Sequence, residues 1–250
     1  MVGVATPSVD AASRLKVVII VGPVEGQTAS YIADAKQYAA QTRSYGARVT
    51  EIYSPNATWA RVVKAVQGAN LVIYLGHGNG SPSPYGAFSA YTKDGFGLNA
   101  QANHGNSNRK YYGEYYVKKY FRFAKNAVVI LNHLCYSAGS SEPGKPDPTL
   151  AVAKQRVDNF GAGFLRANAR AVFALATSDA SPIIDGLFHS PRSFAHLFMN
   201  APDANMSTAF SFSSKRTPGA QAWMDPSGPT TFHRSLVGWA RWSASTFRKG

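Results

Sequence analysis

The feature that most constrains the fold is an alternation of short, mostly apolar runs with segments of helical periodicity. Five runs have the length and the β-branched content of strands, and they cover residues 15–22, 47–54, 69–76, 127–132 and 169–176. Strands that are largely apolar and alternate with helices are typical of a parallel sheet covered on both faces. The sequence therefore predicts an α/β fold, a three-layer α-β-α sandwich around a mostly parallel sheet.

Right-handed crossovers place the C-terminal ends of all parallel strands at one edge of the sheet. Ligands and chemistry collect at that edge, so the residues that follow each strand are the candidates for function. The strongest helical patterns between and after the strands cover residues 28–46, 56–68, 147–165 and 191–199. In the third of these, Asp147 is the expected N-cap, because proline follows it at the first helical position.

The organisation of the chain favours a single domain over residues 1–250, without an internal repeat or a low-complexity tract. Residues 1–14 are expected to form an N-terminal extension, and residues 200–250 the outer part of the same domain. Residues 79–108 are too long for a minimal crossover and are predicted to be an insertion loop. No run of about 18 apolar residues is present, so we expect no membrane span. Residues 1–14 show no signal-peptide pattern.

The charge balance is strongly basic, with 26 Lys and Arg against 13 Asp and Glu, a net charge of +13. Such an excess favours polyanionic partners, such as nucleic acid or an anionic cell envelope. The densest segment, 109–125, interleaves aromatic and basic residues, but its spacing predicts an amphipathic helix rather than a specific nucleic-acid surface. The expected solvated stripe consists of Lys110, Glu114, Lys118 and Arg122. The expected packed stripe consists of Tyr112, Tyr116, Tyr120 and Phe123.

The turn after the first strand, "VGPVEGQT" at 21–28, lies where a phosphate-binding loop would begin. Its two glycines are one residue too close for G-x-x-x-x-G-K-[ST], and Gln27 occupies the lysine position. The segment is therefore interpreted as a strand-to-helix turn, and no cofactor is predicted.

Two strand ends carry residues with chemical potential: "LVIYLGHG" at 71–78 and "VVILNHLC" at 128–135. Cys135 is the single cysteine of the chain, so an intramolecular disulfide is excluded. If the two strands are neighbours, His77 and Cys135 emerge at the same sheet edge. A thiol beside an imidazole forms the core of a cysteine nucleophile, and the backbone N–H groups of Gly78 and Cys135 would form an oxyanion hole. A buried structural cysteine is the alternative reading.

A metal site is the main rival for these residues. His133 and Cys135 form an H-x-C pair, and His77 and His104 are further possible ligands of zinc. The chain has no second cysteine, and the pair lacks the usual ligand spacing. We therefore predict no metal, and interpret His133 and Asn132 as residues that support the loop or contact substrate.

The two strand ends, in this order, resemble the caspase-like (clan CD) cysteine peptidases, which include caspases, metacaspases, legumain and gingipains. The strand and helix order is similar over residues 15–200, and "NHLCYSAG" at 132–139 resembles bacterial secreted caspase-like proteins that have been little characterised. The resemblance implies a caspase-haemoglobinase fold with about six strands. It also implies hydrolysis of a protein or peptide substrate outside the cell, with His77 as general acid/base and Cys135 as nucleophile. The Gln-Ala-Cys-x-Gly signature of caspases is absent, since Leu134 precedes the cysteine.

Substrate preference is the least determined property. A basic substrate side chain would need a carboxylate beside the site, and Asp179, just past the fifth strand, is the candidate for this role. Asp94 and Glu142 compete for the role, and a solvated turn or local cap is the simpler interpretation of Asp179. A function of another class is also compatible with the sequence: a catalytically silent caspase-like module whose basic surface binds polyanions or the cell envelope. The oligomeric state is not indicated.

Overall fold

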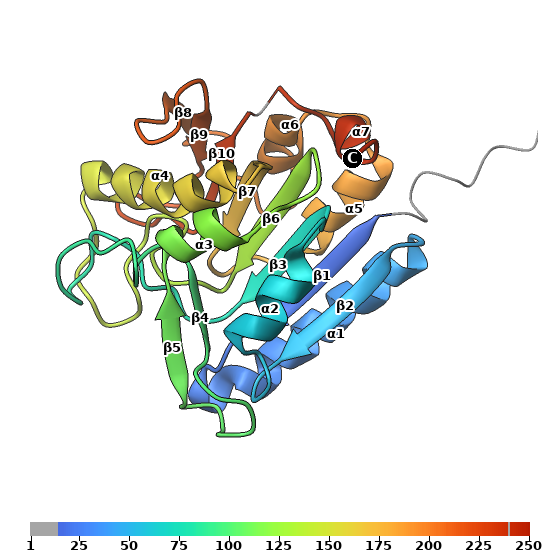
Figure 1. The fold of residues 1–250 in the computed structure, drawn as a ribbon. Helices are drawn as coiled ribbons and strands as arrows, with labels where there is room; N and C mark the ends of the chain where they lie inside the picture. The colour runs from blue at the N-terminus through green and yellow to red at the C-terminus, as the bar shows by residue number, and fades with distance from the viewer. Residues whose placement is uncertain (1–14, 240) are drawn as a thin grey trace, which may run out of the picture.

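The computed structural model describes residues 15–239 and 241–250, and the predicted extension at 1–14 lies outside them. Its main feature is an eight-stranded sheet with the order β2-β1-β3-β6-β7-β10-β9-β8 (Figure 1). Neighbours among the first five pair in parallel, as predicted. These five strands are β1 (Lys16–Val21), β2 (Arg48–Tyr53), β3 (Leu71–Leu75), β6 (Ala127–Asn132) and β7 (Ala169–Leu175).

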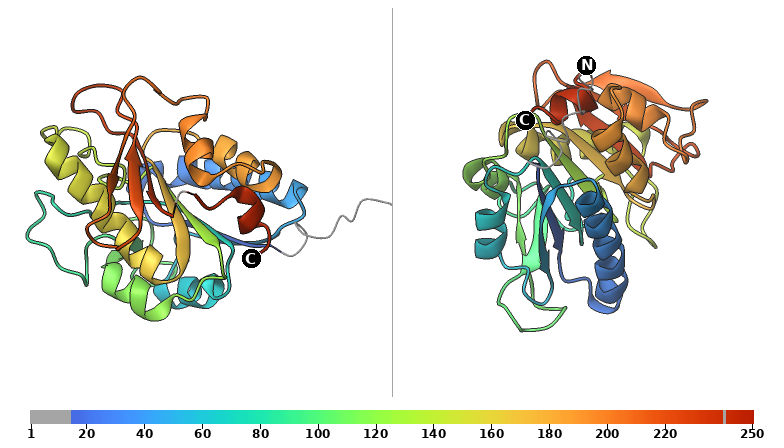
Figure 2. Two further views of the ribbon diagram at one scale, coloured as in Figure 1. Left: turned by 90° about the horizontal axis from the view of Figure 1, so that it is seen from above. Right: turned by 90° about the vertical axis from the view of Figure 1, so that its right-hand side faces the viewer.

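Helices cover both faces of the sheet, as the two views of Figure 2 show. One face carries α1 (Thr28–Ser44), α5 (Ser181–His189), α6 (Phe194–Met199) and α7 (Ala244–Phe247). The other carries α2 (Trp59–Val66), α3 (Glu114–Tyr120) and α4 (Leu150–Arg166). Each layer of helices buries its own apolar core against the strands between them. The predicted three-layer α-β-α sandwich is confirmed.

The C-terminal part of the chain extends this sheet. β8 (Phe210–Ser213), β9 (Gln221–Met224) and β10 (Arg234–Gly238) pair antiparallel with one another, and β10 pairs antiparallel with β7. The expected count of about six strands is therefore two too few. These strands are short and contain Ser, Gln and Gly among their apolar residues, so they lack the continuous apolar run of a parallel strand.

Residues 109–125 do not form one helix, so that prediction is wrong. The first residues of this segment form the strand β5 (Arg109–Tyr112), and α3 begins only at Glu114. β5 pairs antiparallel with β4 (Phe96–Asn99), which lies inside the segment 79–108 that was predicted to be an insertion loop. Gly113 separates the two elements, where an added Cβ would lie 2.5 Å from the Ala90 carbonyl oxygen. The second half of the segment keeps its helical pattern, because Trp59 of α2 packs against its aromatic side chains.

Glu114 also departs from the solvated stripe expected for it. Its side chain is buried, and both carboxylate oxygens accept hydrogen bonds from Nη2 of Arg216, at 2.7 and 2.8 Å. A buried carboxylate requires such a partner, because an unpaired charge in the interior is strongly destabilising. The helical period identified the position of Glu114 but not the arginine, which lies 102 residues further along the chain.

Candidate active site

Three adjacent parallel strands end at one edge of the sheet and place three side chains of interest there. Glu25 follows β1, His77 follows β3 and Cys135 follows β6, and β3 lies between the other two strands. The backbone after β3 touches the backbone after β6, because a Cβ built on Gly78 would lie 1.9 Å from the carbonyl oxygen of Cys135. The predicted neighbourhood of the two strand ends is therefore present.

His77 is held by a carboxylate that the sequence analysis did not identify. Its Nε2 lies 2.8 Å from Oε2 of Glu25, and Glu25 also forms an ion pair with Arg109. Burial on its own would raise the pKa of Glu25, but the hydrogen bonds from His77 and Arg109 outweigh it and lower that pKa. Glu25 thus remains a carboxylate and fixes the orientation of the imidazole. The sequence does carry a signal for Glu25, since it is an acidic residue just after the first strand. The pattern of that turn was compared only with a phosphate-binding loop.

Cys135 is a half-buried free thiol on the wall of a cavity of about 580 Å³. Burial raises the pKa of this thiol, and the Glu142 carboxylate raises it further. The resting side chain is therefore a thiol and not a preformed thiolate. Two residues of the loop around it, His133 and Tyr136, adopt φ values of 60° and 69°, a region uncommon for residues other than glycine.

Four parts of the chain form the walls of this cavity: the start of α1 and the loops after β6, after β7 and before β10. The loop after β6 is tied to the segment before β10 by three hydrogen bonds. Thr230 Oγ1 donates to Asp147 at 2.6 Å, the Phe232 N–H donates to Ser140 Oγ at 2.7 Å, and the Ser140 N–H donates to the Phe232 carbonyl at 3.2 Å. Asp147 was predicted to cap α4, but it forms part of the cavity wall instead. The cap is Thr149, whose hydroxyl accepts from the N–H group of Val152.

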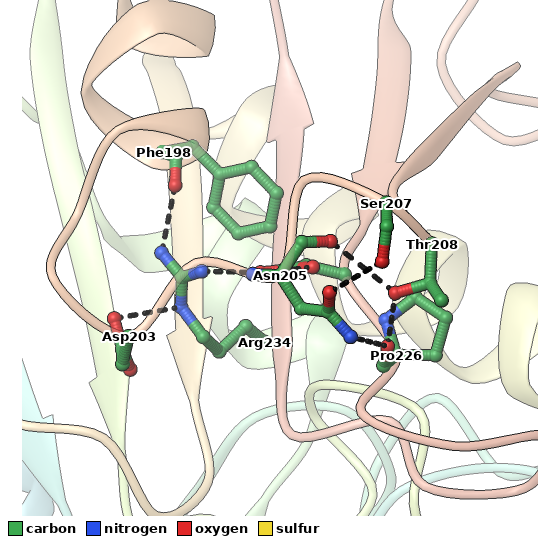
Figure 3. A network of polar contacts seen from close by, with 8 residues as sticks. Phe198, Asp203, Asn205, Ser207, Thr208, Pro226 and Arg234 are labelled. Carbon is green, nitrogen blue, oxygen red and sulfur yellow. Dashed lines mark hydrogen bonds and ion pairs between the residues drawn. The ribbon is translucent and has the colours of Figure 1, made fainter.

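A polar network around the buried Arg234 fixes the far wall, where the chain enters β10 (Figure 3). The guanidinium of Arg234 donates to the Phe198 carbonyl at 2.7 Å and lies 3.3 Å from the Asp203 carboxylate. It also pairs with Asp225, a second buried residue. Asn205 donates in turn to the Pro226 carbonyl. The segment that leads from β9 to the cavity is thereby anchored at its first residues.

Of the residues assigned to substrate from the sequence, His133 lines the cavity with Cys135. Its ring stacks on Tyr31 with centroids 4.9 Å apart, and its Nε2 lies 3.5 Å from the Asp34 carboxylate. Asn132 is fully buried. Its amide nitrogen donates to the carbonyls of Leu175 and Ser178, and its oxygen accepts from the Tyr38 hydroxyl. Asn132 thus holds the loop that follows β7.

The acids considered for a basic substrate side chain lie in different surroundings. Asp179 is exposed, and its Oδ1 accepts hydrogen bonds from the N–H and hydroxyl of Ser181, at the start of α5. Asp94 is fully buried, and burial raises the pKa of its carboxyl well above the usual range. Glu142 is the one of the three that lines the cavity with Cys135, where it accepts a hydrogen bond from Tyr85.

Residues 15–239 and 241–250 contain neither a metal-binding cluster nor a helix suited to a membrane. No group of three or more His, Cys, Asp or Glu side chains there is placed to hold a metal ion. No helix in the same residues has the length and apolar character needed to cross a bilayer.

Comparison with models of protein families finds no match, and no curated protein matches the chain. Among solved structures the chain is similar to the Arg-specific cysteine proteinase gingipain R, at 14% identity and a TM-score of 0.42, over 95% of this chain and 63% of that one. It is also similar to a protein from Geobacter sulfurreducens, at 14% identity and a TM-score of 0.35, over 74% of this chain and 86% of that one. The chain thus spans less than two thirds of the gingipain R structure. Because both TM-scores are low, neither likeness carries our functional argument.

Proposed function

We propose that this chain is a cysteine endopeptidase in which Cys135 is the nucleophile and His77 the general acid/base. The observation that carries the proposal is the direct backbone contact of Gly78 with Cys135 at the ends of β3 and β6, beside a cavity that the thiol lines. A cysteine and a histidine on neighbouring strand ends, with a third group orienting the histidine, form the arrangement that activates a thiol.

The chemistry follows from the state of each group. Because Cys135 rests as a thiol, the proton must leave sulfur as the sulfur–carbon bond forms. Glu25 engages Nε2 of His77, which leaves Nδ1 to accept that proton. The backbone N–H groups of Gly78 and Cys135 would stabilise the oxyanion. His77 then protonates the leaving amine as the carbon–nitrogen bond breaks, and water hydrolyses the resulting thioester. No metal or cofactor is required in this scheme.

A peptide-library cleavage assay tests the proposal. We expect cleavage by the natural chain and a loss of at least about a thousandfold in Cys135→Ala and His77→Ala. His189→Gln is the matched control, since this exposed histidine at the end of α5 lies outside the cavity that Cys135 lines, and we expect it to retain activity within about tenfold.

Labelling separates an activated thiol from a merely accessible one. Peptidyl acyloxymethyl ketones place an electrophilic carbonyl at the nucleophile, whereas iodoacetamide reports thiolate and access. Because Cys135 is the single cysteine, every label reports on that residue. We expect the ketone to label the natural chain and not His77→Ala, while iodoacetamide labels both alike. Equal ketone labelling of the two chains, with no cleavage of any peptide, would refute the peptidase and favour the catalytically silent module.

Glu25 is proposed as a positioning residue. Glu25→Gln keeps the shape of the side chain and removes the charge that orients His77, so we expect kcat to fall about 10- to 100-fold with KM little changed. Arg109→Gln removes the other partner of Glu25 and is expected to retain most of the activity. If the two variants lose kcat equally, Glu25 acts through the ion pair with Arg109 and not through His77.

The resemblance to secreted caspase-like proteins supports two further parts of the proposal, a protein or peptide substrate and action outside the cell.

A further inference from the structure

A second cavity, of about 730 Å³, lies at the opposite end of β10 from the candidate active site. His233, just before β10, lines the Cys135 cavity, whereas Gly238 and Trp239 at the end of the strand line the second one. At about 3.4 Å per residue, the strand separates the two by roughly 17 Å. The second cavity is therefore a distinct feature at the other edge of the sheet.

Tryptophan side chains dominate its wall. Trp223, Trp239 and Trp242 all line it, and they are three of the four tryptophans in the chain. Each is half-buried: one part of the side chain packs on a core cluster, and the rest remains accessible. Large aromatic side chains gathered around a hollow at the surface are characteristic of a binding site.

The polar groups at this cavity are donors and cations. Arg241 and Gln221 are exposed on its wall, and the Ser193 hydroxyl lies there as well. The guanidinium of Arg170 lies over two of the tryptophans, 5.4 Å from the centroid of Trp239 and 4.8 Å from that of Trp242. None of the described residues that line the cavity is Asp or Glu. The site thus combines flat apolar faces with hydrogen-bond donors and uncompensated positive charge.

We propose that this cavity binds an acidic saccharide. The C–H faces of pyranose rings pack on indole rings, ring hydroxyls hydrogen-bond to Gln221 and Ser193, and a carboxylate or sulfate group pairs with Arg241. The volume lies within the range of about 300–1,000 Å³ typical of small-ligand sites. A proline-rich peptide also packs on tryptophan, but it makes no use of the cations, and the charge at the cavity favours the acidic sugar.

Intrinsic fluorescence of the full chain tests this proposal, because most of its tryptophans line the cavity. The probes are hexagalacturonate, cellohexaose as a neutral sugar of equal length, and a proline-rich peptide. We expect hexagalacturonate to produce a saturable change, with an affinity at least tenfold higher than that of cellohexaose. Trp59→Phe is the matched control, because Trp59 does not line the cavity but stacks on Tyr112 and Phe121, and it should retain the full response.

Variants of the cavity complete the test. Trp239→Ala is expected to weaken hexagalacturonate binding at least tenfold, with thermal unfolding used to check that it folds. Gln221→Ala and Arg241→Gln change exposed side chains and are expected to fold normally and to lose affinity, the arginine variant more for the acidic sugar than for the neutral one. The proposal is overturned by no response to any sugar, by equal affinity for both sugars, or by binding of the peptide in their place. It is also overturned if the Gln221 and Arg241 variants both bind as well as the natural chain.

Discussion

The Cys135 thiol and the Glu142 carboxylate are coupled across the candidate active site. Burial raises the pKa of the thiol, and the negative charge of Glu142 raises it further, so less thiolate is present at any given pH. Glu142→Gln removes the second contribution and is expected to lower the pKa of Cys135. The pH profile of iodoacetamide alkylation should then move to lower pH, with faster alkylation at pH 8.

Asp147→Asn is the matched control for this prediction, because Asp147 is another carboxylate on the wall of the same cavity. Its charge is not among the causes of the shift at Cys135, so its profile should stay at that of the natural chain. Profiles that move equally in the two variants would show that the effect is general screening and not the charge of Glu142.

At the scale of residues, the sequence predicted His77 and Cys135 because each follows an apolar run that ends at the same sheet edge. It did not predict the hydrogen bond from His77 to Glu25, which depends on how the turn after β1 folds toward β3. The sequence could not predict the burial of Asn132 either, since its hydrogen-bond partners Tyr38 and Ser178 come from distant segments. Local pattern indicates which strand end a residue follows, whereas the direction of its side chain depends on tertiary packing.

At the scale of elements, the parallel strands were predictable and the edge strands were not. β3 and β6 are buried on both faces and therefore consist of apolar residues, apart from the hydrogen-bonded Asn132 at the end of β6. β8 is an edge strand whose residues alternate between exposed and half-buried, and four residues are too few for that alternation to stand out. β5 was predicted as helix because its strand partner, β4, comes from the preceding insertion.

The close approach of β3 and β6 gives a prediction at this scale. In Gly78→Ala the added Cβ would meet the backbone oxygen of Cys135 at 1.9 Å, and backbone cannot yield as a flexible side chain does. We expect the free energy of unfolding in urea to fall by about 1–3 kcal/mol. Gly26→Ala is the control, because nothing lies within 4 Å of its added Cβ. Equal unfolding free energies of the two variants would contradict the prediction, because the ends of β3 and β6 could then move apart without loss of stability.

The insertion before β4 is held by one buried cation. The Nζ of Lys93 donates to Asn79 Oδ1 at 2.9 Å, Ser83 Oγ at 2.8 Å and the Tyr85 carbonyl at 3.0 Å. Burial lowers the pKa of this amine, although these hydrogen bonds satisfy its donors.

Lys93→Met removes all three hydrogen bonds and leaves their acceptors unpaired, so the loop they hold should open locally. We expect chymotrypsin to cleave at Tyr85 or Phe88, both exposed, at least tenfold faster than in the natural chain. Lys110→Met, a substitution of an exposed lysine on β5, should leave the cleavage rate unchanged. Faster cleavage throughout the chain would indicate global unfolding, and the local role of Lys93 would then be wrong.

At the scale of the whole molecule, the excess of basic residues is concentrated on one face. Residues 55–70 and 100–126, which include α2, β5 and α3, contain no Asp or Glu except the buried and paired Glu114. Besides Arg109, which pairs with Glu25, the exposed cations of these segments are Arg61, Lys64, Lys110, Lys118, Lys119, Arg122 and Lys125. A surface of this kind attracts polyanions without reading their sequence.

We therefore predict salt-dependent binding of a short oligothymidylate at this face, whether or not the chain is a peptidase. Replacing Lys118, Lys119 and Arg122 together by Glu should abolish most binding at low salt and reduce the slope of log affinity against log salt by about 2. A control with the same change in net charge replaces Lys36, Arg192 and Lys249, which are exposed on other elements. If the control weakens binding as much as the α3 variant, net charge alone governs the association. If the natural chain does not bind at low salt, the basic face has no polyanion partner, and the alternative of a polyanion-binding module loses its basis.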